Sequence, residues 1–194
     1  GAEGGPADPQ ELQCMVSMVA LVVTLVRERQ AAGMPPRECL RREVVHWLAF
    51  ADHTHTQLSS ALSSRLAAHP DLDGVLAEVA DFSQAKLQDR GKYVLKKELW
   101  AEFDPYFLHF ARSDLEEALE RARASGVYKM GWSLRPPARP PAPLERLYDL
   151  LHTPTCHRLV RGALDYACAH PSTGASELAL AATQLVALAL GDPQ

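Results

Sequence analysis

Three short segments in the first half of the chain repeat apolar residues at the spacing of an amphipathic helix. They span residues 35–50, 54–66 and 72–82. The second opens at Thr54 with a Thr-x-x-Gln capping box, and Asp71, which follows a proline, is the expected cap of the third. The apolar positions are Leu40, Val44, Trp47 and Leu48, then Leu58, Leu62 and Leu66, then Leu72, Val75, Leu76, Val79 and Phe82. We therefore expect three consecutive helices.

A turn and an outgoing β-strand follow these helices. Residues 89–96 read Asp-Arg-Gly-Lys-Tyr-Val-Leu-Lys, in which Gly91 is expected to supply the positive φ of a hairpin turn. Tyr93 and Leu95 then alternate with their neighbours, as in a half-buried strand. Three helices followed by a β-hairpin is the element order of a winged-helix domain. The sequence therefore predicts a mainly α chain with a winged-helix domain, three helices plus a small β-hairpin wing, at residues 36–112.

The flanking segments are predicted to be helical. Asp8 suits the cap of a helix over residues 9–30, and its apolar run of 13 residues is shorter than the roughly 20 needed to span a bilayer. This helix is too apolar to face water alone, so we expect it to pack against the apolar C-terminal helices. The expected divisions are residues 1–8, disordered or the cut edge of a larger protein without a signal peptide; 9–34, the N-terminal apolar helix; 113–132, a charged helix and loop closed near Gly126; 133–143, a proline-rich connector; and 144–194, a C-terminal segment with helices at 144–152, 157–170 and 176–190.

Composition bounds the function classes. Of the 194 residues, 47% are hydrophobic, which is ample for a core, and the net charge of −4 argues against a general binder of polyanions. The four cysteines lie too far apart for a C-x-x-C pair, which fits reduced intracellular thiols better than disulfides or a zinc cluster. They are Cys14, Cys39, Cys156 and Cys168. We expect no cofactor in this chain.

A winged helix binds either nucleic acid or protein, and the third helix favours protein. A helix that reads the major groove needs basic or amide side chains on its outer face. Residues 71–82 contain no lysine or arginine and four acids, which would repel phosphate. A solvated helix face accounts for the same carboxylates equally well. The acids are Asp71, Asp73, Glu78 and Asp81.

The predicted wing is basic, and an aromatic segment follows it. Lysines beside the turn fit contact with phosphate, but they also protect an edge strand from unwanted pairing. The aromatic segment, residues 100–110, is either core or an exposed protein-binding surface, and Tyr106 is expected to keep its hydroxyl in water. Trp100, Phe103 and Phe107 have the spacing of core residues. The candidate interaction residues are Lys92, Lys96, Tyr106, Asp71, Asp73 and Glu78.

No catalytic, cofactor-binding or metal-binding set is predicted. His53 and His55, beside Asp52, resemble zinc ligands, but a capping turn explains them and their spacing does not fit one helix face. Adjacent residues such as Cys156 and His157 point apart, so they do not form a nucleophile and base. His46 and His109 lie in apolar segments, where a hydrogen-bonded core histidine is the usual case. The sequence contains no P-loop, GxGxxG or GxSxG motif.

Three landmarks, in order, resemble the UBR-type ubiquitin ligases, the N-recognins. They are Leu-Arg-Arg-Glu-Val-Val-His at residues 40–46, Gly-Lys-Tyr-Val-Leu-Lys at 91–96 and Tyr-Phe-Leu-His-Phe-Ala-Arg at 106–112. The resemblance extends over about residues 15–190, and no single motif carries it. It implies the winged-helix and helical scaffold in the middle of a very large chain. The substrate-binding UBR box would precede it, and the RING that engages a ubiquitin-conjugating enzyme would follow it.

The sequence departs from that family where activity resides, because it contains neither a cysteine-rich UBR box nor a RING. The resemblance thus implies a non-catalytic scaffold that positions the substrate-binding and RING modules of a RING-type ligase of the N-degron pathway. Zinc would be bound elsewhere in the parent chain. The implied partners are other domains of the ligase and, through the parent chain, ubiquitin-conjugating enzymes and protein substrates, with no nucleic acid and no membrane. The implied location is the cytoplasm, with the nucleus also open.

Two alternatives stay open. One is a winged-helix regulator that binds nucleic acid, with salt-sensitive affinity that depends on Lys92 and Lys96. The other is a free-standing winged-helix adaptor, whose partner binding would depend on exposed aromatic residues and little on salt.

Overall fold

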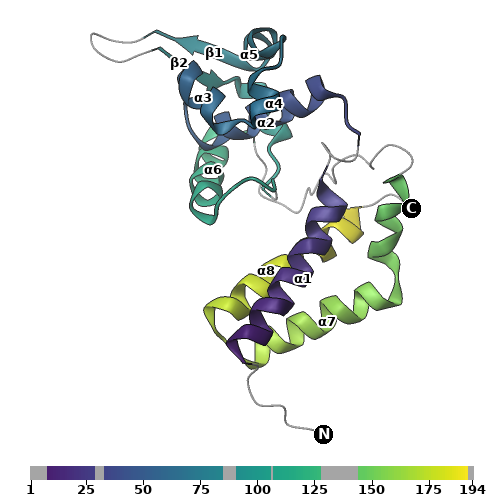
Figure 1. The fold of residues 1–194 in the computed structure, drawn as a ribbon. Coiled ribbons are helices and arrows are strands. Elements are labelled where there is room, and N and C mark those ends of the chain that lie inside the picture. Colours follow the sequence, from purple (N-terminus) through teal and green to yellow (C-terminus); the bar gives the residue numbers. More distant parts are fainter. Residues whose placement is uncertain (1–7, 29–32, 85–90, 106, 128–143, 192–194) are drawn as a thin grey trace, which may run out of the picture. The chain divides into compact units, whose positions relative to one another are not determined.

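The computed structural model separates the chain into two compact units, a winged-helix unit at residues 29–133 and a helical unit formed by residues 1–28 and 134–194 (Figure 1). It describes residues 8–28, 33–84, 91–105, 107–127 and 144–191. The predicted connector at 133–143 and Tyr106 lie outside the described residues.

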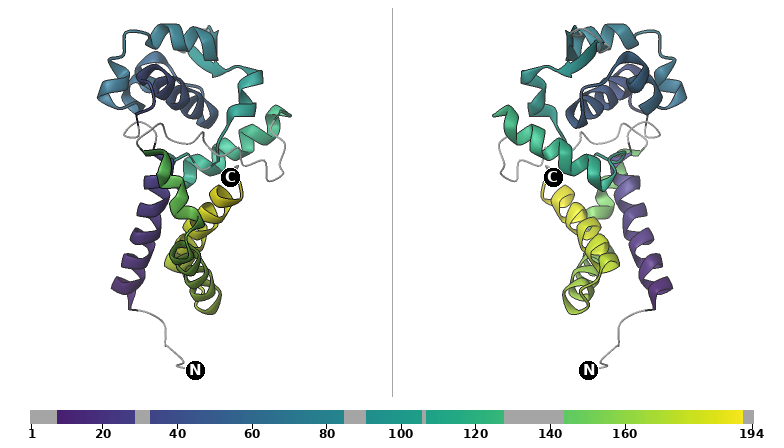
Figure 2. Two further views of the ribbon diagram at one scale, coloured as in Figure 1. Left: turned by 90° about the vertical axis from the view of Figure 1, so that its right-hand side faces the viewer. Right: turned by 90° about the vertical axis from the view of Figure 1, so that its left-hand side faces the viewer.

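The helical unit packs α8 (Thr173–Gly191) against both α1 (Pro9–Arg27) and α7 (Pro154–Ala169), as the views in Figures 1 and 2 agree. A short 3₁₀ helix, η2 (Leu144–His152), packs against α7 and α8. The predicted packing of the apolar N-terminal helix on the C-terminal helices is confirmed. The fully buried side chains of the helical unit include Val19, Tyr148, Leu151, Leu178 and Leu185.

The first helix begins as predicted and ends earlier than predicted. The side chain of Asp8 accepts a hydrogen bond from the backbone N–H of Gln10 at 3.3 Å, which caps α1. The helix ends at Arg27 and Glu28 is extended, so the predicted end at residue 30 is wrong. The polar run after Val26 has no apolar side chain to bury, so packing does not favour further helix there.

In the winged-helix unit, α2 (Pro36–Phe50) lies in the centre of the core with Leu40, Val44 and Leu48 fully buried. The predicted capping box is confirmed at the start of α3 (His55–Ala61), where Thr54 and Gln57 bond reciprocally. The predicted second helix is in fact two helices, since Leu62 is extended between α3 and α4 (Ser64–Ala67). Serines flank this break, and their side chains compete with helical backbone bonds.

The third helix, α5 (Leu72–Val79), is shorter than predicted, because residue 80 begins a strand. Phe82 was predicted to lie on the helix, but it lies on β1 (Ala80–Ser83) and is exposed. Strand β1 pairs antiparallel with β2 (Lys92–Leu95), in a register that sets Phe82 opposite Tyr93. Pairing between the two strands therefore overrides the helical spacing of the apolar residues.

A third, very short strand completes the sheet. The backbones of His53 and Tyr93 exchange two hydrogen bonds of 3.2 and 2.8 Å, so the loop after α2 pairs with the outer edge of β2. Gly91 does not have the predicted positive φ. A Cβ there would lie 2.2 Å from the ring of Phe82, so Gly91 permits the close approach of that ring instead.

After the sheet, the 3₁₀ helix η1 (Lys97–Glu102) leads to α6 (Arg112–Ser125). The predicted closure of that helix is confirmed at Gly126, which takes the left-handed conformation with φ of 70°. Arg121 of α6 forms an ion pair with Asp52 and thereby joins α6 to the loop that carries the third strand.

Candidate protein-interaction surface

Two of the acids predicted to make the third helix an interaction surface are held by arginines of α2. The Arg37 guanidinium contacts Asp71 at 2.6 Å and Glu78 at 2.8 Å. Arg41 contacts Glu78 at 2.6 Å and binds both oxygens of Glu102 at 2.5 and 2.9 Å. These ion pairs join α2 to α5 and to η1. Asp71 stands at the start of α5 without a side-chain capping bond, because its carboxylate faces Arg37.

The same contacts set the protonation of the carboxyl groups. Hydrogen bonds from Arg41 and Arg37 hold the pKa of Glu78 below its ordinary value, and the bond from Arg41 does the same for Glu102. In return, the bond to Glu102 raises the pKa of the Arg41 guanidinium. The charges of this network are therefore fixed at neutral pH.

Lys96 also has a structural contact. Its Nζ atom donates to the carbonyl oxygens of Ala77 and Glu78, both at 2.8 Å, at the C-terminal end of α5. These carbonyls accept no hydrogen bond from within the helix. A cation at this end also interacts favourably with the helix dipole. Lys92 is exposed on β2, and Asp73 is almost fully exposed on α5 with His55 at 3.4 Å. The five candidate residues that the structure describes thus do not form one cluster, and an interaction role for all six stays a prediction.

Replacing Lys96 with alanine is expected to lower the free energy of unfolding of the winged-helix unit by about 1 kcal/mol, because two carbonyls of α5 lose their donor. Urea unfolding followed by tryptophan fluorescence checks this, since all three tryptophans lie in this unit. Lys92→Ala is the matched control and should change stability by less than about 0.5 kcal/mol. Equal stability of both variants would remove the capping role.

The predicted aromatic core is confirmed. Trp100, Phe103 and Phe107 are each buried, and the first two belong to the same core cluster as α2. His46 lies among the phenylalanines, with its ring stacked on Phe107 at 4.3 Å between centroids. Its Nδ1 bonds the carbonyl of Arg42 at 2.7 Å, and its Nε2 bonds the backbone N–H of Asp104 at 3.1 Å. His46 is therefore the hydrogen-bonded core histidine that the sequence predicts.

The second predicted core histidine is exposed instead. His109 keeps almost half of its side chain in solvent and contacts the Glu43 carboxylate at 2.8 Å. It lies in an apolar segment of sequence, but it projects towards the polar face of α2.

The described residues contain no group of three or more metal-ligating side chains. His53 serves through its backbone as the third strand, and burial lowers the pKa of its imidazole. His55 is the first residue of α3. Burial raises the pKa of the Cys156 thiol, which disfavours the thiolate that a nucleophile would need.

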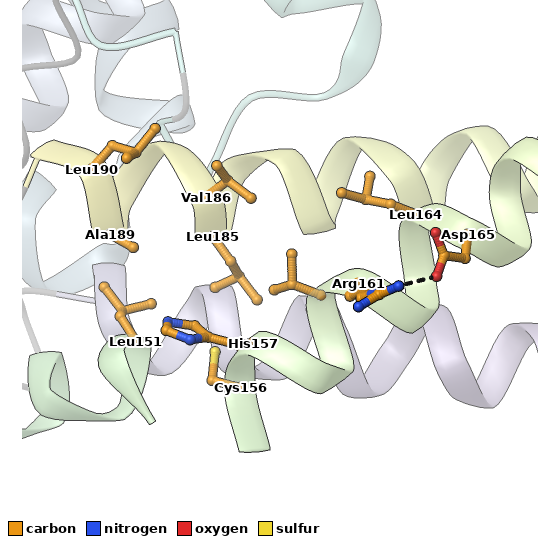
Figure 3. Close-up of a pocket in the computed structure, with 11 residues that line it drawn as sticks. Leu151, Cys156, His157, Arg161, Leu164, Asp165, Leu185, Val186, Ala189 and Leu190 are labelled. Carbon is orange, nitrogen blue, oxygen red and sulfur yellow. Dashed lines mark ion pairs between the residues drawn. The ribbon is translucent and has the colours of Figure 1, made fainter. Parts of the chain in front are cut away.

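The helical unit contains an apolar groove of about 390 Å³ between α7 and α8, shown in Figure 3. Arg161 and Asp165 form an ion pair of 3.5 Å beside it, and His157 lines it together with Leu151. Its other lining residues are Cys156, Val160, Leu164, Leu185, Val186, Ala189 and Leu190. The sequence did not predict this groove, because it is formed by residues of η2, α7 and α8 that only the tertiary packing brings together.

By length and composition alone, α1 and α8 are each able to cross a membrane, with mean hydropathy of 1.5 and 1.4. Helices of a protein core meet the same test, and these two pack on each other. Several large apolar side chains are nevertheless exposed on them, namely Met18, Leu21, Leu25, Leu180 and Leu190. The absence of a membrane partner stays a prediction.

The helices α2 to α5 followed by an antiparallel hairpin, with a third strand bridging to β2, define the class of this protein as a winged-helix protein. Residues 39–129 match the family described as E3 ubiquitin-protein ligase UBR1-like, winged-helix domain. This match and the similar proteins below identify residues 39–129 as a UBR1-like winged-helix domain and support a region of the UBR-type N-recognins.

Similar proteins agree with this assignment. The E3 ubiquitin-protein ligase UBR2 of Mus musculus is 31% identical over 166 residues, which are 82% of this chain and 10% of the relative. The ligase PRT6 of Arabidopsis thaliana is 35% identical over 111 residues, 57% of this chain and 6% of the relative. The ligase ubr-1 of Caenorhabditis elegans is 24% identical over 97% of this chain and 10% of the relative. The chain thus spans a tenth or less of the length of these relatives.

Proposed function

We propose that this chain is a non-catalytic, protein-binding scaffold within a RING-type ubiquitin ligase of the N-degron pathway. It holds the substrate-binding and RING modules of the ligase at a fixed geometry for ubiquitin transfer. Its partners are other domains of the ligase and, through them, ubiquitin-conjugating enzymes and protein substrates. The residues that catalyse the transfer lie outside this chain.

The observation that carries this proposal is the arginine network of α2. Through Arg37, Arg41 and Arg42 this one helix is joined to α5, to η1 and to Asp104, at sequence separations of 34 to 62 residues. A scaffold that transmits geometry needs such rigid connections between its elements. The composition of α5 also supports a protein partner over nucleic acid, because the helix contains no lysine or arginine to meet phosphate.

The test replaces residues 36–127 of the parent ligase with a glycine-serine linker. Ubiquitin transfer to a substrate with a destabilising N-terminus is expected to fall about tenfold or more, because the linker no longer holds the two modules in register. Discharge of ubiquitin from the conjugating enzyme to free lysine should persist, as should binding of the substrate N-terminus. Unchanged transfer to the substrate would contradict the scaffold.

A second arm tests nucleic acid. The 194-residue chain is expected not to retain a random DNA duplex at low or moderate salt. Retention at low salt that is lost at higher salt, and lost on charge reversal of Lys92, would favour the nucleic-acid regulator.

A further inference from the structure

The free edge of the wing has backbone groups that point outwards. The N–H and C=O of Tyr93 both bond to His53, so they point away from β1. In an antiparallel pair, opposed residues have backbone groups that point either towards each other or away from each other. Phe82 is opposite Tyr93, so its N–H and C=O point away from β2.

The next hydrogen bond between the two strands supports this assignment of inward and outward backbone groups. The N–H of Lys96 donates to the carbonyl of Val79 at 3.1 Å, and Val79 lies three residues before Phe82. An odd separation places Val79 on the bonded side of the strand and Phe82 on the outer side. Among the residues that the structure describes, none forms a backbone bond with Phe82 on that side. This edge is therefore open to another strand.

An aromatic shelf lies beside the open edge. The side chain of Phe82 is 57% exposed, and its ring packs against Tyr93 with centroids 5.2 Å apart. Gly91 lies under the same ring, where a Cβ would be 2.2 Å away. The Phe82 ring thus packs on Tyr93 and Gly91, and its remaining surface presents an apolar face to solvent. We use the name wing edge for the outer backbone of β1 together with the rings of Phe82 and Tyr93.

The wing edge also carries a negative charge. Asp81 is exposed on β1 and forms no ion pair or side-chain hydrogen bond with any residue that the structure describes. Asp71 and Glu78, by contrast, are both held by arginines. Natural sheets often protect an edge with lysine, proline or a bulge. Strand β1, Ala-Asp-Phe-Ser, contains no lysine or proline and instead has an aromatic residue and an acid.

We propose that the wing edge binds an extended protein segment, which adds to β1 as a further strand. Its backbone would bond the N–H and C=O of Phe82, an apolar side chain would pack on the Phe82 ring, and a lysine or arginine would face Asp81. Neither a helix nor a nucleic acid offers peptide N–H and C=O groups to pair with a strand edge. This inference rests on the proposed scaffold function and names a surface through which a partner is held.

The test titrates the 194-residue chain with the acetylated, amidated peptide Thr-Lys-Val-Lys-Val-Thr and follows backbone amides by NMR. The largest shifts are expected at residues 80–83, together with slower hydrogen exchange of the Phe82 amide. Phe82→Thr keeps the outer N–H and removes the ring, and should weaken binding about threefold. Phe82→Pro removes both and should weaken it about tenfold or more. Proline at this outer position leaves the bonds to β2 intact, so the hairpin should keep its amide spectrum.

Charge is tested separately. Asp81→Lys should weaken binding of the lysine peptide about threefold, and a peptide with glutamate in place of lysine should regain that loss. Asp73→Lys changes an exposed acid on α5 and is the matched control, with no expected effect. The proposal is overturned if no amide shifts at about 1 mM peptide, or if the shifts lie elsewhere. It is also overturned if Phe82→Pro binds as Phe82→Thr does. If the linker replacement abolishes ubiquitin transfer but the peptide does not bind, the scaffold function is supported and only the wing-edge proposal is wrong.

Discussion

Replacing His46 with alanine is expected to lower the free energy of unfolding of the winged-helix unit by about 3 kcal/mol. The side chain is 2% exposed, so its removal leaves a cavity beside Phe107. It also removes partners from the carbonyl of Arg42 and from the N–H of Asp104, which are held at 2.7 and 3.1 Å. A buried donor left without an acceptor adds its desolvation cost to that of the cavity.

The measurement is urea unfolding followed by tryptophan fluorescence. His109→Ala is the matched control, because His109 lies on the same segment as Phe107 but is nearly half exposed. Its loss should cost less than about 1 kcal/mol. The variant His46→Phe should restore part of the packing without the two hydrogen bonds. Its free energy of unfolding should therefore lie between those of the wild type and His46→Ala. If His46→Ala matches the control, the ring does not connect α2 to residues 103–107.

Replacing Arg41 with alanine is the second large effect, with an expected loss of about 2 kcal/mol at neutral pH. One guanidinium joins α5 to η1, through Glu78 at 2.6 Å and through both oxygens of Glu102. Its removal leaves Glu102 without this arginine and leaves Glu78 with only Arg37 as its cation. The expected loss of unfolding free energy is small for three hydrogen bonds, because solvent reaches both Arg41 and its partners.

This loss should depend on pH in one direction. The folded pKa values of Glu78 and Glu102 are lowered by Arg41, so the pairs stabilise the fold fully above the unfolded glutamate pKa of about 4.3. That contribution falls as the pH drops through the lower folded values. The stability difference between wild type and Arg41→Ala should be constant from pH 7 to about 5.5 and shrink below about 4.3. The readout is the urea midpoint across this range.

Asp73→Ala is the control for a surface pair in the same unit. Asp73 contacts His55 at 3.4 Å with 89% of its side chain in solvent, so its replacement should give no measurable change. A difference for Arg41→Ala that persists undiminished at pH 3 would assign its role to packing of the aliphatic stem.

Local sequence signals predicted much of the fold. The Thr54 capping box, the Asp8 cap and the left-handed closure at Gly126 each depend on residues within one turn. The serial order of helices and hairpin, with three short family landmarks, was enough to predict the winged helix and the ligase family. Each of these signals acts over a few residues or over their order, so no distant contact is required to read it.

The candidate surface was less predictable, because its charges depend on partners far along the chain. The acids of α5 appeared to be a free negative face, yet Asp71 and Glu78 are paired with arginines 34 to 41 residues away. From the sequence, Lys96 was a candidate interaction residue on the basic wing, and in the structure its amine caps α5. Phe82 appeared to be a helical core residue from its spacing and is the exposed ring of the wing edge.

The sequence by itself determined which segments are helical, where most of them begin and which family the winged-helix domain resembles, because capping, apolar spacing and motif order are local. Only the tertiary structure decided that residue 80 leaves the helix for a strand, that the loop at His53 becomes a third strand, and which charges stay free. Strand pairing and ion pairs join residues distant in sequence, and their free energy outweighs the weak local preference of any one segment.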